Sequence, residues 1–130
     1  MIFLFDANLS PRIVTALCVF DDPNISYIHA NDHFPLGTAD EDLFKVAASK
    51  GWLFVSLDHR IKKNRAQRAS LLGSGIGAFI FVGRAQRTQR RIAAQVLDNT
   101  DEMIRHADKT KPPYIYEITD RGKFNLLRVV

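Results

Sequence analysis

Aspartates directly follow two apolar segments of this sequence: Asp6 comes after residues 2–5, and Asp58 comes after residues 52–57. Continuous apolar runs of this length are typical of strands that are buried on both faces of a parallel sheet. Ligand sites in open α/β sheets form at the carboxyl ends of such strands, so we expect both carboxylates at one edge of the sheet. Each aspartate alone also fits a local role as the cap of a turn or a helix.

A third carboxylate is expected from the helix that follows the second strand, where the candidates are Asp40, Glu41 and Asp42. Asp40 precedes Leu43 and Phe44 by three and four residues, so it shares the face that packs on the sheet. Thr38 and Glu41 have the spacing of a capping box, which gives Glu41 a local role. We therefore predict Asp40 as the third ligand and keep Glu41 as the alternative.

Three converging carboxylates indicate a site for a hard divalent cation. Mg²⁺ binds through carboxylates and waters and keeps positions open for phosphate oxygens. Two such ions about 3.5–4 Å apart activate the attacking water and stabilise the leaving oxygen of a phosphodiester. The residue types therefore predict metal-dependent hydrolysis of phosphodiester bonds, and no protein nucleophile is evident.

The elements that must position these acids alternate between short β-rich runs and amphipathic segments, which is the pattern of βαβ units around a parallel sheet. Ser10 and Pro11 supply an N-cap and a first helical residue. The predicted strands are 2–5, 25–29, 52–57 and 77–82, the helices are 11–20, 38–50, 62–72 and 88–106, and a hairpin pairs 114–119 with 124–130. We predict an α/β sandwich with a mainly parallel sheet.

Length and composition limit the class of protein. The chain has 130 residues, of which 46% are hydrophobic, so we expect one domain over residues 1–130 with an adequate core. The single cysteine, Cys18, excludes an internal disulfide and a cysteine-based zinc site, and we expect it in the core. No signal peptide and no membrane-spanning run is readable, so we expect a cytoplasmic protein.

The charges are divided unevenly along the chain, whose net charge is +4. Residues 1–59 hold eight acidic and three basic residues, whereas residues 60–130 hold six acidic and fifteen basic ones. An acidic half joined to a basic half suits a site that holds cations and attracts a polyanion. Uneven sampling of solvated surface residues is the alternative explanation.

Basic residues follow Asp58 closely and are expected to flank the carboxylate site as phosphate contacts for RNA, with a solvated helix face as the alternative. These residues are Arg60, Lys62, Lys63, Arg65 and Arg68. A second basic cluster, of Arg84, Arg87, Arg90 and Arg91, is expected on the surface, with RNA binding as the alternative. The aromatic residues Tyr114, Tyr116 and Phe124 are expected to cover a sheet edge or form a homodimer face, with base stacking as the alternative.

Three segments resemble a known family. The opening Phe3-Leu-Phe-Asp-Ala-Asn-Leu-Ser-Pro-Arg12 is similar to the start of PIN-like domains, in which a strand ends in a metal-binding aspartate. The segments Asp32-His-Phe-Pro-Leu-Gly-Thr-Ala-Asp-Glu-Asp-Leu43 and Gly51-Trp-Leu-Phe-Val-Ser-Leu-Asp58, followed by His59-Arg-Ile-Lys-Lys63, resemble the PIN-like branch of VapC-type toxins. The similarity covers nearly the whole chain.

This resemblance implies a PIN-like α/β/α sandwich with Mg²⁺- or Mn²⁺-dependent endoribonuclease activity. It also implies the toxin of a toxin–antitoxin pair, inhibited by a cognate antitoxin. Asp6, Asp40 and Asp58 match the metal-binding acids, with Ser56 and Asn8 in supporting positions. Many PIN domains carry a further aspartate two residues beyond the last acid, and here that position is Arg60.

One alternative function remains open from the sequence, and a second is disfavoured. The arginine at position 60 leaves room for a PIN-like module that binds RNA or protein without cleaving it. A phosphoacceptor signalling domain has a similar length and a similar order of strands and helices. Such a domain needs an acidic pair after the first strand and a lysine after the last parallel strand, and Asp6-Ala7 and Gly83-Arg84 do not provide them.

Overall fold

A computed structural model describes residues 1–20, 22–57, 64–83 and 87–127 of the chain. The strands and helices follow one another in the order β1 (Ile2–Phe5), α1 (Pro11–Leu17), β2 (Ser26–His29), α2 (Ala30–His33), α3 (Asp40–Ser49), β3 (Leu53–Ser56), α5 (Arg65–Gly73), β4 (Gly77–Phe81), α6 (Gln89–Lys109), β5 (Tyr114–Ile118) and β6 (Phe124–Leu127).

The six strands form one sheet in the order β2-β1-β3-β4-β5-β6. The first five strands are parallel, and β6 is antiparallel to β5, so the predicted C-terminal hairpin is confirmed. After β2 the chain crosses to the other side of β1 to add β3. The carboxyl ends of β1 and β3 therefore lie side by side, with Phe5 in register with Val55.

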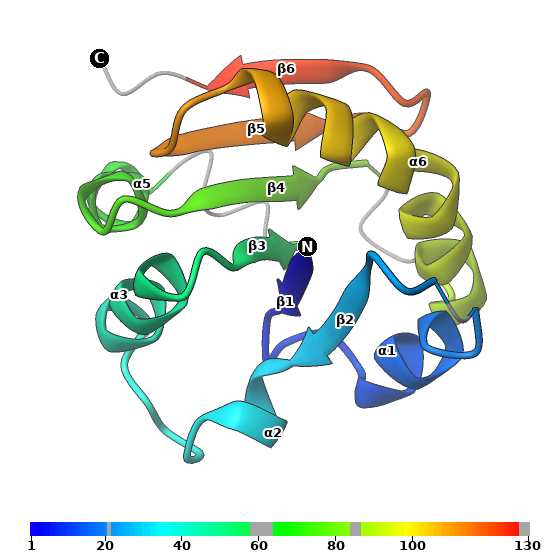
Figure 1. Ribbon diagram of the computed structural model, residues 1–130, viewed down its shortest axis with the longest axis horizontal. Coiled ribbons are helices and arrows are strands. Elements are labelled where there is room, and N and C mark those ends of the chain that lie inside the picture. The colour runs from blue at the N-terminus through cyan, green and yellow to red at the C-terminus, as the bar shows by residue number, and fades with distance from the viewer. Residues whose placement is uncertain (21, 58–63, 84–86, 128–130) are drawn as a thin grey trace.

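Helices cover both faces of the sheet, which gives the predicted α/β/α arrangement (Figure 1). Helices α1 and α6 pack together on one face, and α3 and α5 pack on the other. The alternation of side chains along β1 divides its residues between the two layers: Phe3 and Phe5 point toward α1 and α6, and Leu4 points toward α3 and α5. The apolar run of β1 thus reflects burial on both faces.

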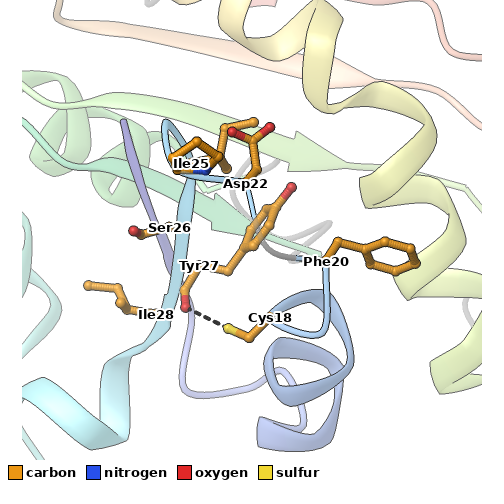
Figure 2. Close-up of a pocket in the computed structure, with 8 residues that line it drawn as sticks. Cys18, Phe20, Asp22, Ile25, Ser26, Tyr27 and Ile28 are labelled. Carbon is orange, nitrogen blue, oxygen red and sulfur yellow. Dashed lines mark hydrogen bonds between the residues drawn. The ribbon is translucent and has the colours of Figure 1, made fainter.

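Helix α1 begins as predicted but ends earlier. Ser10 is its N-cap and accepts a hydrogen bond from the Arg12 amide at 3.2 Å. The last helical residue is Leu17 rather than residue 20, and Cys18 is exposed, so its expected place in the core is wrong. The Cys18 thiol donates to the carbonyl oxygen of Tyr27 at 3.3 Å, on the edge strand β2 (Figure 2).

The predicted capping box at the start of α3 is also wrong. Ala39, not Thr38, is the N-cap, and it provides no side-chain hydrogen bond. The Thr38 hydroxyl donates instead to the Pro35 carbonyl oxygen at 2.6 Å, within the turn that precedes the helix. Glu41 forms an ion pair with Lys45 at 3.3 Å, one turn further along α3. The Thr38 hydroxyl is therefore used in the preceding turn and does not cap α3.

The aromatic residues of the hairpin belong to the core. Tyr114 and Tyr116 are buried on β5, an internal strand, and both rings contact Phe79. Phe124 on β6 is half-buried and stacks on His106 of α6 with ring centroids 4.3 Å apart. Stacking of RNA bases on the two tyrosines is incompatible with this burial.

Within the described ranges, no helix combines the length and the apolar character required to cross a bilayer. The longest helix, α6, has 21 residues and carries charged side chains along its exposed face.

A close contact between β4 and β5 gives a prediction about stability. A Cβ atom at Gly77 would overlap the ring of Tyr114, which is buried and unable to move aside. We expect Gly77→Ala to lower the free energy of unfolding by about 1–3 kcal/mol, measured by urea denaturation. Gly73→Ala is the control, because a Cβ there meets open space at the end of a helix. Equal stability of the two variants would contradict this account of the packing.

Candidate carboxylate site

Asp6 is the first residue after β1, at the carboxyl edge of the sheet. Its amide donates to the Val55 carbonyl oxygen at 3.0 Å, which continues the contact between β1 and β3 beyond the last paired residue. The Ser56 hydroxyl donates to Oδ2 of Asp6 at 3.0 Å, and the Asn8 amide approaches Oδ1 at 3.4 Å. Donors from two separate segments thus orient this half-buried carboxylate.

Ser56 and Asp6 meet because the strand order reverses between β1 and β3. This reversal is the switch point at which open α/β sheets bind their ligands. Ser56 is 1% exposed, so its hydroxyl is held in the core and cannot turn to solvent. The structure therefore brings together two of the predicted site residues, with Asn8 contributing through its backbone.

Asp40 is the first residue of α3 and its side chain is exposed. Leu43, Phe44 and Ala47 on the same helical face are buried against the sheet, as expected. Since α3 connects two parallel strands, its first turn lies toward the carboxyl edge where β2 ends. Its last turn reaches the beginning of β3, where the Trp52 amide donates to the Ala47 carbonyl oxygen at 2.9 Å. Asp40 thus lies toward the carboxyl edge of the sheet, the edge at which Asp6 follows β1.

Asp58 lies outside the residues that the structure describes, so the convergence of Asp6, Asp40 and Asp58 stays a prediction. Within the described part of the chain, no three histidine, cysteine, aspartate or glutamate side chains gather closely enough to hold a metal ion. The oxygen donors that are present, the Asp6 carboxylate beside the Ser56 hydroxyl, are of the type that Mg²⁺ and Mn²⁺ prefer.

The structure describes some of the predicted RNA-binding residues but not others. Arg60, Lys62 and Lys63 lie outside it, whereas Arg65 and Arg68 lie on α5. This helix begins at Arg65, with Asn64 as its N-cap, and packs through Leu71 on the face shared with α3. Two of the five predicted basic residues therefore lie on a helix that packs on the same face of the sheet as α3, the helix of Asp40.

One arginine of the second basic cluster is buried instead of exposed. The Arg87 side chain is 7% exposed, donates to Oε1 of Gln95 at 3.0 Å, and lies 4.0 Å from the Asp120 carboxylate. Burial lowers the pKa of the Arg87 guanidinium, and the charge of Asp120 opposes that shift. Because Gln95 also donates to Asp120 at 3.1 Å, Arg87 joins α6 to the β5–β6 turn and is not a surface contact.

Glu117 is a buried acid that the sequence pattern did not single out. It is 7% exposed on β5 and lies in register with Ile80, which in turn is in register with Ser56. Side chains alternate along each strand, so Glu117 and Ser56 point to the same face of the sheet, toward α3 and α5. The sequence signal for Glu117 is a charged residue inside a run of tyrosine and isoleucine. Such a residue is informative because burying a carboxylate is costly without a partner.

Two surface pockets lined by described residues lie away from Asp6 and Ser56. One, of about 470 Å³, lies beside the edge strand β2 and the end of α1, where Phe20 and Asp22 line it (Figure 2). Another, of about 360 Å³, lies between α1 and α6, and Ile13 and Leu97 form part of its floor. Neither of these two pockets is lined by Asp6, Asp40 or Ser56.

Comparison with known proteins supplies the family. A family model described as a PIN-like domain matches residues 1–83, which include β1 through β4 and all three predicted acids. No curated protein and no solved structure matches the chain. The match covers more than half of the chain and agrees with the α/β/α sandwich and with a strand-end aspartate at the switch point. The chain therefore belongs to the PIN-like domain family, part of a superfamily of nucleases.

Proposed function

We propose that this protein is a Mg²⁺- or Mn²⁺-dependent endoribonuclease of the cytoplasm. We propose further that it is the toxin of a type II toxin–antitoxin pair, inhibited by a cognate antitoxin. The observation that carries the proposal is the Asp6 carboxylate, oriented by Ser56 at the switch point of a PIN-like sheet. The toxin role rests on the resemblance of the segments 32–43 and 51–63 to VapC-type proteins.

The residues proposed to hold the metal are Asp6, Asp40 and Asp58. Glu41 is the weaker alternative to Asp40, because its carboxylate is already paired with Lys45. A bound divalent ion supplies the positive charge that activates water and stabilises the negative charge developing on the phosphate. The three proposed ligands are all carboxylates, which suits a hard cation.

The remaining steps are assigned to the chain's own residues. Ser56 holds the Asp6 carboxylate in one orientation through its hydroxyl, so the acid does not need to reorganise when substrate binds. Arg65 and Arg68, with Arg60, Lys62 and Lys63, bind the RNA backbone through its phosphates. Water attacks the phosphorus, and the 3′ or 5′ oxygen leaves with no covalent protein intermediate.

A second candidate function is a PIN-like module that binds RNA or protein without cleaving it. The observation that favours it is Arg60, at a position where many PIN domains carry an aspartate. A positive charge there replaces one carboxylate of the metal site. The two functions differ in a single assay, because only the nuclease cleaves RNA when Mg²⁺ or Mn²⁺ is added.

The nuclease proposal predicts the effect of removing single carboxylates. Asp6→Asn and Asp58→Asn should each reduce metal-dependent RNA cleavage by more than about 100-fold, because a ligand of the catalytic ion is lost. Cleavage of structured RNA is measured with Mn²⁺ and with chelator, and circular dichroism checks folding. Asp98→Asn, an exposed acid on α6, is the matched control. Full activity in both site variants would overturn the assignment.

The hydrogen bond between Ser56 and Asp6 predicts a smaller effect. Ser56→Ala removes the hydroxyl that orients Oδ2 of Asp6, so the dissociation constant for Mn²⁺ should rise about 10-fold or more. Isothermal titration calorimetry measures this change. Ser49→Ala removes a hydroxyl that bonds only within α3, and it should leave Mn²⁺ binding unchanged. Unaltered binding in Ser56→Ala would show that the hydroxyl has no orienting role.

The basic residues predict a salt dependence. In an Asp6→Asn background, which prevents cleavage, RNA affinity should fall steeply with salt, and Arg65→Ala should reduce the slope of log Kd against log salt by about 1. Fluorescence anisotropy at several salt concentrations gives these slopes. Arg105→Ala removes an equal charge from α6 on the other face of the sheet. If both variants shift the slope equally, the contacts of Arg65 are not specific to this edge.

A further inference from the structure

His29 is a buried histidine at the carboxyl end of β2, close to the segment that carries Asp6. It is 1% exposed and lies in register with Phe5, the residue before Asp6. Its Nε2 atom lies 2.7 Å from the carbonyl oxygen of Leu9, and its Nδ1 atom accepts from the Asn31 amide at 3.1 Å. Both ring nitrogens are thus engaged by backbone groups from two different segments.

The partners of the ring determine where its proton lies. A carbonyl oxygen only accepts hydrogen bonds, so the short contact with Leu9 requires a proton on Nε2. A backbone amide only donates, so the contact with Asn31 requires an unprotonated Nδ1. The neutral ring with its proton on Nε2 is the one form that satisfies both contacts.

The contact with Leu9 holds the loop that follows Asp6. The Leu9 amide donates to the Asp6 carbonyl oxygen at 3.0 Å, and the Leu9 carbonyl oxygen accepts from His29. The amide of Asn8, within the same loop, approaches the Asp6 carboxylate. Leu9 and Asn8 therefore connect the ring of His29 with Asp6 and its carboxylate.

The contact with Asn31 holds the start of α2, on the chain segment that leads to Asp40. His29 is the N-cap of α2, and its ring accepts the amide at the start of that helix. From α2 the chain continues through residues 34–39 to Asp40, the first residue of α3. One ring therefore connects the loop of one proposed metal ligand with the segment that leads to another.

We propose that His29 is a positioning residue for the carboxylate site, and that its Nε2–H···O=C bond to Leu9 sets the orientation of Asp6. The inference rests on the proposed metal-binding function but concerns a residue that does not touch the metal or the RNA. A residue that is only part of the core would affect folding without a specific effect on Asp6.

Variants at position 29 separate the two hydrogen bonds. The side-chain nitrogen of glutamine reaches about as far as Nε2 and can donate to Leu9, whereas the oxygen of asparagine replaces Nδ1 alone. We expect His29→Gln to bind Mn²⁺ within about 3-fold of the parent protein, and His29→Asn to bind about 10- to 100-fold more weakly. His106→Asn is the control, since His106 also bonds a backbone carbonyl but lies on α6.

Nuclear magnetic resonance of the metal-free protein tests the contact itself. The ¹⁵N shifts of His29 should show a protonated Nε2, and the Leu9 amide should exchange faster in His29→Asn than in His29→Gln. Thermal denaturation measures the loss of stability in each variant. The positioning role would be overturned if His29→Asn and His29→Gln bound Mn²⁺ equally well and any loss of affinity merely followed the loss of stability.

The outcome also distinguishes this inference from the proposed function. If the parent protein binds no Mn²⁺, the nuclease proposal fails, and the role of His29 is decided by the Leu9 exchange rates and the Asp6 side-chain resonances. If the parent binds Mn²⁺ and His29→Asn leaves both the affinity and the Asp6 resonances unchanged, the nuclease proposal stands and the role of His29 is refuted.

Discussion

The reversal of strand order between β1 and β3 is the constraint on which the site depends. It places the buried carboxyl ends of two parallel strands side by side, so the first polar residue after β1 meets the last residue of β3. Asp6 remains half-buried there because Ser56 and the Asn8 amide offset part of the cost of removing its charge from water. A strand order that placed another strand between β1 and β3 would separate these groups by two strand spacings, roughly 10 Å.

The parts of the fold that the sequence predicted are those set by local burial and local capping. Strands buried on both faces are apolar without interruption, so β1, β3 and β4 were located to within one residue at most of their ends. Ser10 followed by Pro11 marks the start of α1 for a reason confined to three residues. The capping box failed because its pattern omits the preceding turn, where the Pro35 carbonyl takes the Thr38 hydroxyl.

The residues that sequence reasoning missed depend on partners that are remote along the chain. His29 is informative only once Leu9 is known to lie against it, and Glu117 only once β5 is known to be an internal strand on the same sheet as Ser56. Arg87 was grouped with neighbouring arginines by charge, yet Gln95 and Asp120 enclose it. A single sequence shows that a residue is polar, but the strand order decides whether that residue is buried and what it contacts.

The uneven distribution of charge along the chain is reflected in α3 and α5, the two helices that pack on the face of Ser56 and Glu117. Helix α3 carries three acids in its first turn, where negative charge is favourable, while α5 begins with Arg65 and has no acid in its first turn. Both helices follow strands and so begin at the carboxyl edge of the sheet. An arginine at the positive end of a helix is unfavourable for the helix itself, and it becomes favourable when an anion lies nearby. Negative charge from α3 and positive charge from α5 at one edge suit the proposed binding of a cation and a phosphate, whereas the enclosed charge of Arg87 contributes to neither.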